Sequence, residues 1–238
     1  MFQRSLVRTM MVGNGAAALG AILSRSGSAA QMETKPTVDS VTEVASTRWI
    51  KLQTLDWTDQ TGRSRKWDMA TRTTKSADAD ADAVVILALL KGEGGGVETL
   101  VVEQYRPPVR CTTVEMPAGL IDKNESAEAA ALRELKEETG FVGSVTHVSG
   151  EVCMSPGICD ETVKIVVVDV DLSLPENQNP KQELDEGEFC VVRRVPLASL
   201  RQLLSSSSHM SIEGILLFAF GVELGMGLVG GLSSPPKR

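Results

Sequence analysis

Residues 119–141, GLIDKNESAEAAALRELKEETGF, constrain the fold of this chain more than any other feature. The centre of this stretch is rich in alanine, and its charged residues recur at helical spacing. At about 100° per residue, Glu134, Glu137 and Glu138 lie within about a third of the circumference of a helix. The sequence therefore predicts a helix that carries three carboxylates crowded on one face.

Crowded carboxylates on a helix have two interpretations. Like charges repel one another, and a hard divalent cation such as Mg²⁺ is attracted to such a group of oxygens. Arg133 precedes Glu137 by four residues, so its guanidinium can brace one carboxylate while the others face a metal. The alternative is a solvated helix face, which is the ordinary role of a charge run.

The spacing of the stretch decides between these interpretations. Its glycines and charged residues match the Nudix box at every position that the motif defines: Gly119, Glu125, Arg133, Glu134, Glu137, Glu138 and Gly140, followed by the apolar Phe141. The chain therefore resembles a Nudix hydrolase. This resemblance implies a fold of class α/β, the Nudix α/β/α sandwich with a mixed sheet, preceded by a small N-terminal β-hairpin region.

The segments that flank the box narrow the resemblance to the ADP-ribose, or ADP-sugar, pyrophosphatases. The similarity extends from about Trp49 to Leu224. It is carried by residues 104–108 (QYRPP), residues 115–120 (EMPAGL), Pro156 at 15 residues beyond Phe141, and residues 187–189 (GEF), which resemble the eukaryotic branch. The resemblance implies that the substrate is a nucleoside diphosphate sugar.

The resemblance also assigns a role to the acidic residues of the box. It implies three ligands for Mg²⁺, with Mn²⁺ as a substitute: Glu134, Glu138 and the backbone carbonyl of Ala118. Arg133 and Glu137 are implied to belong to the catalytic group. Glu125 is expected to orient Arg133 and the loop, although some members of the family use this glutamate as a metal ligand.

A charged loop at residues 175–187 precedes Glu188, which the resemblance implies to be the general base or the residue that positions water. A carboxylate close to Mg²⁺ has a lowered pKa and stays ionised at neutral pH. Residues 185–187 (DEG) differ in detail from the family, so Glu186 is an alternative for the same role. A solvated acidic loop is the remaining interpretation.

Five residues are implied to bind substrate: Trp49, Trp67, Arg72, Arg106 and Leu120. Arg106 is expected to clamp the diphosphate with its planar guanidinium, a strand-end salt bridge being the alternative. In the family, two tryptophans sandwich the adenine, one from each subunit of a homodimer, and Arg72 matches a residue that assists. The alternative for Trp49 and Trp67 is simple packing, and Trp57 has no assigned role.

Composition limits the other classes of function. The chain has 238 residues, a formal charge of −7 and a pI near 5.0, which argues against a nucleic-acid-binding surface. Four scattered cysteines without a CxxC motif indicate reduced thiols in an intracellular protein. A metal-dependent enzyme that acts on a small anion remains compatible with this balance, because the metal supplies the local positive charge.

The two ends of the chain have their own interpretations. Residues 1–31 contain three arginines and no acidic residue, which is typical of a mitochondrial targeting leader. A secretory signal and a disordered tail are the alternative interpretations. The alternative location is the cytoplasm. Residues 214–232 are mostly apolar, but Glu223 and many glycines disfavour a membrane span. We expect a core-packed helix at about residues 211–224 and a flexible tail at 226–238.

The rest of the chain divides into an N-terminal β region at residues 46–75, expected to serve dimerisation and adenine binding, and a Nudix domain at residues 76–225. Strands are predicted at residues 46–56, 64–73, 84–90, 98–105, 145–152, 163–170 and 189–195, with a hairpin turn at 59–62. Helices are predicted after Ser126 as N-cap and near residues 197–204. Their order favours a mixed sheet with helices on both faces.

The predicted activity is Mg²⁺-dependent hydrolysis of ADP-ribose to AMP and ribose 5-phosphate, with a homodimer as the assembly. A second hypothesis keeps the chemistry and changes the substrate to another ADP-sugar, another nucleoside diphosphate sugar or an oxidised nucleotide. A third is a non-catalytic sensor of ADP-ribose. Non-catalytic relatives usually lack one or more box carboxylates, and this chain keeps all of them.

Overall fold

The computed structural model describes residues 35–75, 80–92, 96–206 and 209–227. The chain divides into two compact units. The described part of the first unit comprises residues 35–44 and 53–68, and the second contains residues 45–52 and the described residues from 69 onward. The predicted leader at residues 1–31 and most of the predicted tail at 226–238 lie outside the described residues and stay predictions.

A small sheet is formed by β1 (Thr37–Ser46), β2 (Ile50–Thr58) and β3 (Ser64–Arg72), in that order. The predicted hairpin turn is confirmed, because Gly62 at φ 78° donates its N–H to the carbonyl of Asp59 over 2.9 Å. The first predicted strand begins later than expected, since Thr47 turns the chain by donating its N–H to the Ile50 carbonyl over 2.8 Å. Strand β1 has no counterpart in the sequence prediction.

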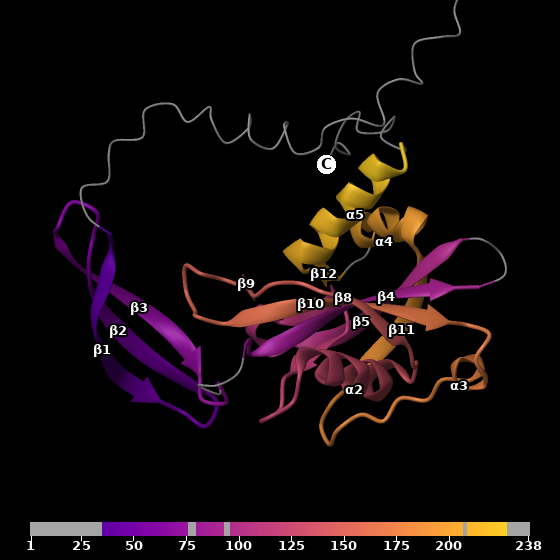
Figure 1. The fold of residues 1–238 in the computed structure, drawn as a ribbon, viewed down its shortest axis with the longest axis horizontal. Helices are drawn as coiled ribbons and strands as arrows, with labels where there is room; N and C mark the ends of the chain where they lie inside the picture. Colours follow the sequence, from indigo (N-terminus) through magenta and orange to yellow (C-terminus); the bar gives the residue numbers. More distant parts are fainter. Residues whose placement is uncertain (1–34, 76–79, 93–95, 207–208, 228–238) are drawn as a thin grey trace, which may run out of the picture. The chain divides into compact units, whose positions relative to one another are not determined.

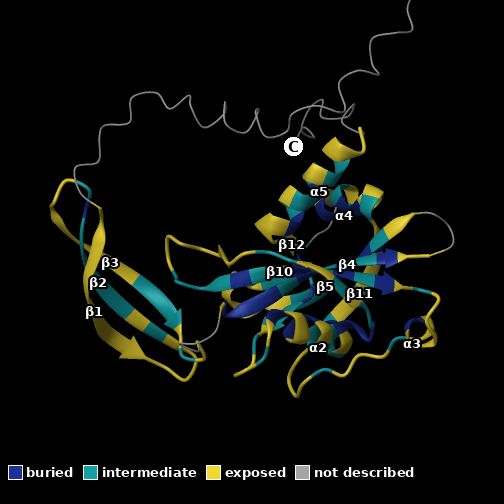
Figure 2. Cartoon of the chain, in the orientation of Figure 1, coloured by how far each residue is buried: buried dark blue, intermediate teal, exposed yellow. Residues whose placement is uncertain are grey.

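This small sheet lacks a hydrophobic core of its own. Every residue of β1 is exposed, including Val38, Val41 and Val44, and between residues 37 and 72 only the polar Asp59 is buried. Figure 2 shows the contrast with the dark, buried central strands of the larger sheet. A sheet that exposes its apolar side chains in this way is suited to being covered by another surface.

The larger sheet has nine strands: β4 (Ala83–Lys91), β5 (Val97–Arg106), β6 (Cys111–Glu115), β7 (Ala118–Leu120), β8 (Ser144–Val148), β9 (Val152–Cys153), β10 (Thr162–Asp171), β11 (Cys190–Pro196) and β12 (Met210–Ser211). Its main path is β12-β6-β5-β4-β10-β8, with β11 on β5, β7 on β4 and β9 on β10. The pairs β4–β10 and β6–β12 are parallel and the others antiparallel. The predicted mixed sheet is therefore confirmed.

Helices cover both faces of this sheet (Figure 1). Helix α2 (Ala127–Thr139) packs on one face, in a cluster with Ile86, Leu90 and Leu100. Helices α4 (Leu200–Ser206) and α5 (Glu213–Gly225) pack on the other. The described residues also contain the short helices η1 (Pro107–Val109), α3 (Pro175–Gln178) and η2 (Leu197–Ser199).

Two predicted elements are corrected in detail. The predicted strand at residues 145–152 is split into β8 and β9, and the predicted loop at 175–188 begins with the short helix α3. The predicted final helix corresponds to α5, and no helix among the described residues is long and apolar enough to cross a membrane.

Helix α2 begins and ends where its sequence predicts. The Ser126 hydroxyl accepts the N–H of Ala129 over 3.2 Å at the N-cap. At the other end Gly140 takes φ 75°, a left-handed conformation, and its N–H closes on the Lys136 carbonyl over 2.8 Å. The buried face of the helix includes Ala127, Ala130 and Ala131. These small side chains let the helix lie close to the sheet.

Substitution of Gly140 by alanine should destabilise the fold strongly. A Cβ at this position would lie 2.3 Å from the backbone nitrogen of Lys181, and an L-residue at positive φ is strained besides. We expect a loss of about 2 kcal/mol or more and a fall in Tm of about 4–8 °C by calorimetry. Gly150→Ala is the matched control, because its Cβ would meet no atom within 4 Å; equal Tm values for the two variants would contradict this account.

Candidate active site

The loop before α2 is held against the larger sheet by backbone hydrogen bonds. Strand β7 pairs with β4, and Ile121 donates its N–H to the carbonyl of Asp82 over 3.1 Å. This pairing places Gly119 against the carboxylate of Glu134, where a Cβ would lie 1.9 Å from the carboxyl carbon. A side chain at this position would displace the Glu134 carboxylate, so the glycine leaves room for the carboxylate where it stands.

Arg133 is the centre of an ion-pair network that joins the loop to the helix. Its guanidinium donates two hydrogen bonds to Glu125, at 3.0 and 2.8 Å, and one each to Glu134 (2.7 Å) and Glu137 (3.0 Å). A fifth hydrogen bond reaches the backbone carbonyl of Leu120 over 2.9 Å. These partners raise the pKa of Arg133, Glu125 foremost, and Arg133 in turn lowers the pKa of Glu125.

Glu138 lies outside this network, and its carboxylate forms no ion pair within the described part of the chain. Its carboxylate accepts the N–H of Ala118 over 3.0 Å. Burial, reinforced by the charges of Glu134 and Glu188, nevertheless raises the pKa of Glu138 to about 8. The pKa of Glu134 is also raised, mainly by burial and despite its bond to Arg133. Two partly buried carboxylates that repel each other attract a cation, because its positive charge offsets both the burial and the repulsion.

The donor set fits Mg²⁺. In the described part of the chain, no group of three or more histidine, cysteine or acidic side chains is placed to hold a metal ion. Mg²⁺ does not require three side-chain ligands, because it keeps several waters and commonly binds to one or two carboxylates and the phosphates of a substrate. Glu134 and Glu138, with the adjacent backbone of Ala118, offer this arrangement of hard oxygen atoms.

Glu188 follows a tight turn at the end of the acidic loop. Gly187 takes φ 90°, the Glu188 N–H donates to the carbonyl of Asp185 over 3.0 Å, and the Glu188 carboxylate accepts the Asp185 N–H over 3.3 Å. The charge of Glu188 raises the pKa of both Glu134 and Glu138. The charge of Glu188 therefore acts on both carboxylates of the pair.

Arg106 forms the strand-end salt bridge that was the alternative to its role as a clamp. Its Nε and Nη2 donate to the two carboxylate oxygens of Glu115, at 2.8 and 2.7 Å. Glu115 is buried, whereas the Arg106 side chain remains 47% exposed. A buried carboxylate that orients a half-exposed guanidinium is compatible with a clamp, because the planar group is fixed before an anion binds.

The remaining predicted substrate residues lie on the surface. Trp49 and Trp67 are 56% and 45% exposed, and the guanidinium of Arg48 lies 4.4 Å from the Trp49 ring centroid. The side chain of Arg72 is paired with Glu161 at 2.7 Å. Simple core packing is thus not the role of either tryptophan, although the Arg48 guanidinium lies over the ring of Trp49.

Two residues near the site had no role in the sequence analysis. Glu115, which orients Arg106, also contributes to the raised pKa of Glu138. The sequence feature that could have indicated Glu115 is its position as the one charged residue of strand β6, CTTVE. The side-chain amide of Gln182 donates to the carbonyl of Glu138 over 2.6 Å. Nothing in the local sequence around Gln182 indicates this contact.

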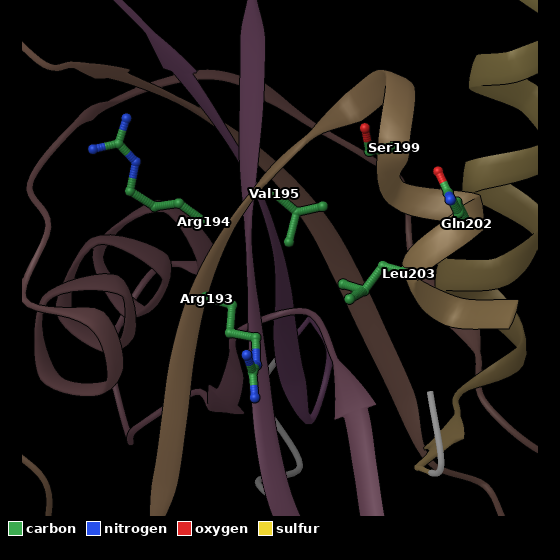
Figure 3. A pocket seen from close by; sticks show the side chains of 6 residues that line it. All are labelled: Arg193, Arg194, Val195, Ser199, Gln202 and Leu203. Atoms are coloured by element: carbon green, nitrogen blue, oxygen red, sulfur yellow. The ribbon is translucent and has the colours of Figure 1, made fainter. Parts of the chain in front are cut away.

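A separate hollow of about 550 Å³ lies beside β11 and α4, lined by Arg193, Arg194, Val195, Ser199, Gln202 and Leu203 (Figure 3). In Figure 3 the two guanidinium groups extend away from Gln202 and Leu203. Arg193 is paired with Glu103 at 2.7 Å, and Arg194 is paired with Glu98. Since their charges are already balanced, the chemistry is better assigned to the box carboxylates than to this hollow.

Comparison with known proteins agrees with this geometry. Residues 80–211, more than half of the chain, match the model of the NUDIX domain. An uncharacterised Nudix hydrolase of Schizosaccharomyces pombe is 39% identical over 75% of this chain and 88% of its own length. The ADP-ribose pyrophosphatase of Saccharomyces cerevisiae is 45% identical (63% of this chain, 64% of the relative), and the ADP-sugar pyrophosphatase of Mus musculus 35% identical (80% and 88%).

A solved structure, the crystal structure of an ADP compounds hydrolase, shares the fold with a TM-score of 0.57 at 23% identity. It covers 82% of this chain and 98% of its own. Fold, box geometry and relatives agree, and the chain belongs to the Nudix hydrolase family.

The charge on Glu138 should lower the stability of the metal-free protein. Because the pKa of Glu138 is raised in the folded protein, ionisation of this carboxyl costs folding free energy. The cost is absent below the pKa of the unfolded chain, near 4.5, and it grows as the pH rises toward about 8. In EDTA at pH 8 we therefore expect Glu138→Gln to melt about 2–6 °C above the wild type, and the two to converge near pH 4.5. Added Mg²⁺ should stabilise the wild type more than the variant.

Differential scanning fluorimetry across this pH range measures the effect. Glu128→Gln, which removes an exposed carboxylate from the same helix, is the matched control and should show no such pH-dependent gain. A Glu138→Gln variant that melts below the wild type in EDTA at pH 8 would refute the charge imbalance.

Proposed function

We propose that the chain hydrolyses the diphosphate of ADP-ribose to AMP and ribose 5-phosphate in a Mg²⁺-dependent reaction. The observation that carries this proposal is the pair of mutually repelling carboxylates, Glu134 and Glu138, held on α2 beside the backbone of Ala118. The named activities of the yeast and mouse relatives support the choice of an ADP-linked diphosphate.

The residues of the chain divide the reaction among them. Arg106, oriented by Glu115, binds the diphosphate, and Arg133 holds the box loop and two carboxylates in register. Glu188 takes a proton from water, whose oxygen forms a bond to one phosphorus while the bond to the bridging oxygen breaks. Glu134, Glu138 and the Ala118 carbonyl would hold Mg²⁺, which would supply positive charge beside the diphosphate.

The activity test uses purified protein, ADP-ribose and Mg²⁺, with AMP followed by chromatography. We expect AMP from the wild type and a fall in turnover of about a hundredfold or more for Glu138→Gln, because the variant has lost a metal ligand. Glu128→Gln should keep wild-type turnover. Near-normal turnover of Glu138→Gln would refute the metal assignment, and tight binding of ADP-ribose without AMP would indicate a non-catalytic sensor.

The second candidate function keeps this chemistry with a different diphosphate. It is favoured by the exposure of the predicted adenine residues, since exposed indole rings can stack on other planar groups. ADP-glucose and a GDP-sugar in the same assay separate the candidates: a kcat/KM for ADP-ribose that exceeds both supports the first.

We also propose that the small sheet of β1, β2 and β3 is covered in a homodimer, which would complete an adenine site containing Trp49 and Trp67. The support is the exposure of Val38, Val41 and Val44 on a sheet without a hydrophobic core. Arg72 is proposed to assist at the adenine site, and Leu120 is proposed to contact the substrate.

Light scattering coupled to size exclusion should give about twice the 25.5 kDa of one chain. Trp49→Ala and Trp67→Ala should each raise the KM for ADP-ribose about fivefold with a smaller change in kcat, because stacking contributes about 1 kcal/mol. Trp57→Phe, at a position with no predicted role, should leave KM unchanged. A monomer with a normal KM in both alanine variants would exclude the shared site.

A further inference from the structure

The last turn of α2 carries Glu137 and Glu138, and the backbone carbonyls at this end of a helix have no partner within the helix. Residues 180–183 cross this end and supply the partners. Glu183 donates its N–H to the Glu137 carbonyl over 2.8 Å, and the side-chain amide of Gln182 donates to the Glu138 carbonyl over 2.6 Å. We name residues 180–183 the strap.

The amide of Gln182 also reaches the residue from which β11 starts. Its Nε2 lies 3.3 Å from the carbonyl of Cys190, and the Cys190 thiol lies 3.8 Å from the Glu138 carbonyl. The Cys190 sulfur is a third acceptor at 3.3 Å, so the two hydrogens of the amide can bond the Glu138 carbonyl and one of the two acceptors of Cys190. Since Cys190 is two residues beyond Glu188, one side chain links the helix that holds the carboxylate pair to the loop that carries the candidate base.

Hydrogen bonds, rather than apolar packing, hold the strap in place. The side chains of Lys181, Gln182 and Glu183 are exposed. Below the strap lies a hollow of about 350 Å³, lined by Thr139, Phe141, Pro180, Gln182, Val192 and Arg194. Because little apolar surface is buried there, packing would not replace the contacts of Gln182 if they were lost.

A link of this kind is needed because the carboxylates it joins repel each other. The charge of Glu188 acts against both Glu134 and Glu138, which tends to move the loop away from the helix. The hydrogen bonds of Gln182 oppose that displacement. Because they are made to backbone carbonyls, they occupy no carboxylate oxygen.

We propose that Gln182 is a positioning residue that sets the separation between the Glu138 and Glu188 carboxylates. The proposal deepens, and rests on, the proposed diphosphate hydrolysis at this site. Its expected effect is on turnover and on metal binding, with little effect on the affinity for the nucleotide, because Gln182 touches neither the tryptophans nor Arg106 in the described contacts.

Gln182→Met tests the proposal, because methionine has a similar length and no N–H donor. The matched control is Gln178→Met, since Gln178 also donates its amide to a backbone carbonyl, that of Leu172, away from the carboxylate pair. For Gln182→Met we expect a fall in kcat of about ten- to hundredfold, a change in the KM for ADP-ribose below about twofold and a higher half-saturating Mg²⁺ concentration. The control should show none of these changes.

A second measurement does not depend on activity. Titration of the full chain with Mn²⁺, followed by electron paramagnetic resonance, should show at least about threefold weaker binding for Gln182→Met than for Gln178→Met, at comparable Tm. If the wild type releases no AMP from ADP-ribose, the proposed function fails, and weakened Mn²⁺ binding would still support the positioning role. Unchanged Mn²⁺ binding, or equal losses of kcat in both variants, would overturn it.

Discussion

The ion-pair network of Arg133 is the interaction on which the site depends. One guanidinium contacts two carboxylates of its own helix, Glu134 and Glu137, and reaches Glu125 and the Leu120 carbonyl in the preceding loop. Removal of such a centre would leave several partly buried carboxylates without a counter-charge, which is among the more destabilising changes in a protein. The position of the loop on the helix and the spacing of the acidic groups therefore both depend on Arg133.

The network does not extend to Glu138, and the hydrogen bond that its carboxylate accepts from the Ala118 N–H does not offset its burial. A fold selected only for stability would replace this carboxylate by a neutral group. Its retention is explained if a cation and an anionic substrate complete the site, because the free energy lost in the empty state is then recovered on binding. The same reasoning explains why Arg106 is held by Glu115 before any anion is present.

The sequence predicts the parts of the molecule that depend on short-range spacing. The box helix, its Ser126 cap and the network of Arg133 all lie within one stretch of chain, so their spacing encodes their geometry. Strand β1 was not predictable in this way, because its valines recur every third residue, at 38, 41 and 44, and do not alternate. The contact of Gln182 with Glu138 spans 44 residues and has no local signature.

The same division separates the chemistry from the choice of substrate. The box carboxylates and the arginines that pair with carboxylates lie on a helix and strands that surround a large buried core. This core holds the charged groups at fixed distances despite their repulsion. Trp67 lies on an exposed strand of the small sheet and Trp49 just before another, and the described residues give that sheet no hydrophobic core. Family membership can therefore be read from a single stretch of sequence, whereas the proposed adenine site depends on surface residues that no such motif encodes. If that proposal holds, a chain of this kind can change its substrate through the small sheet while the box stays the same.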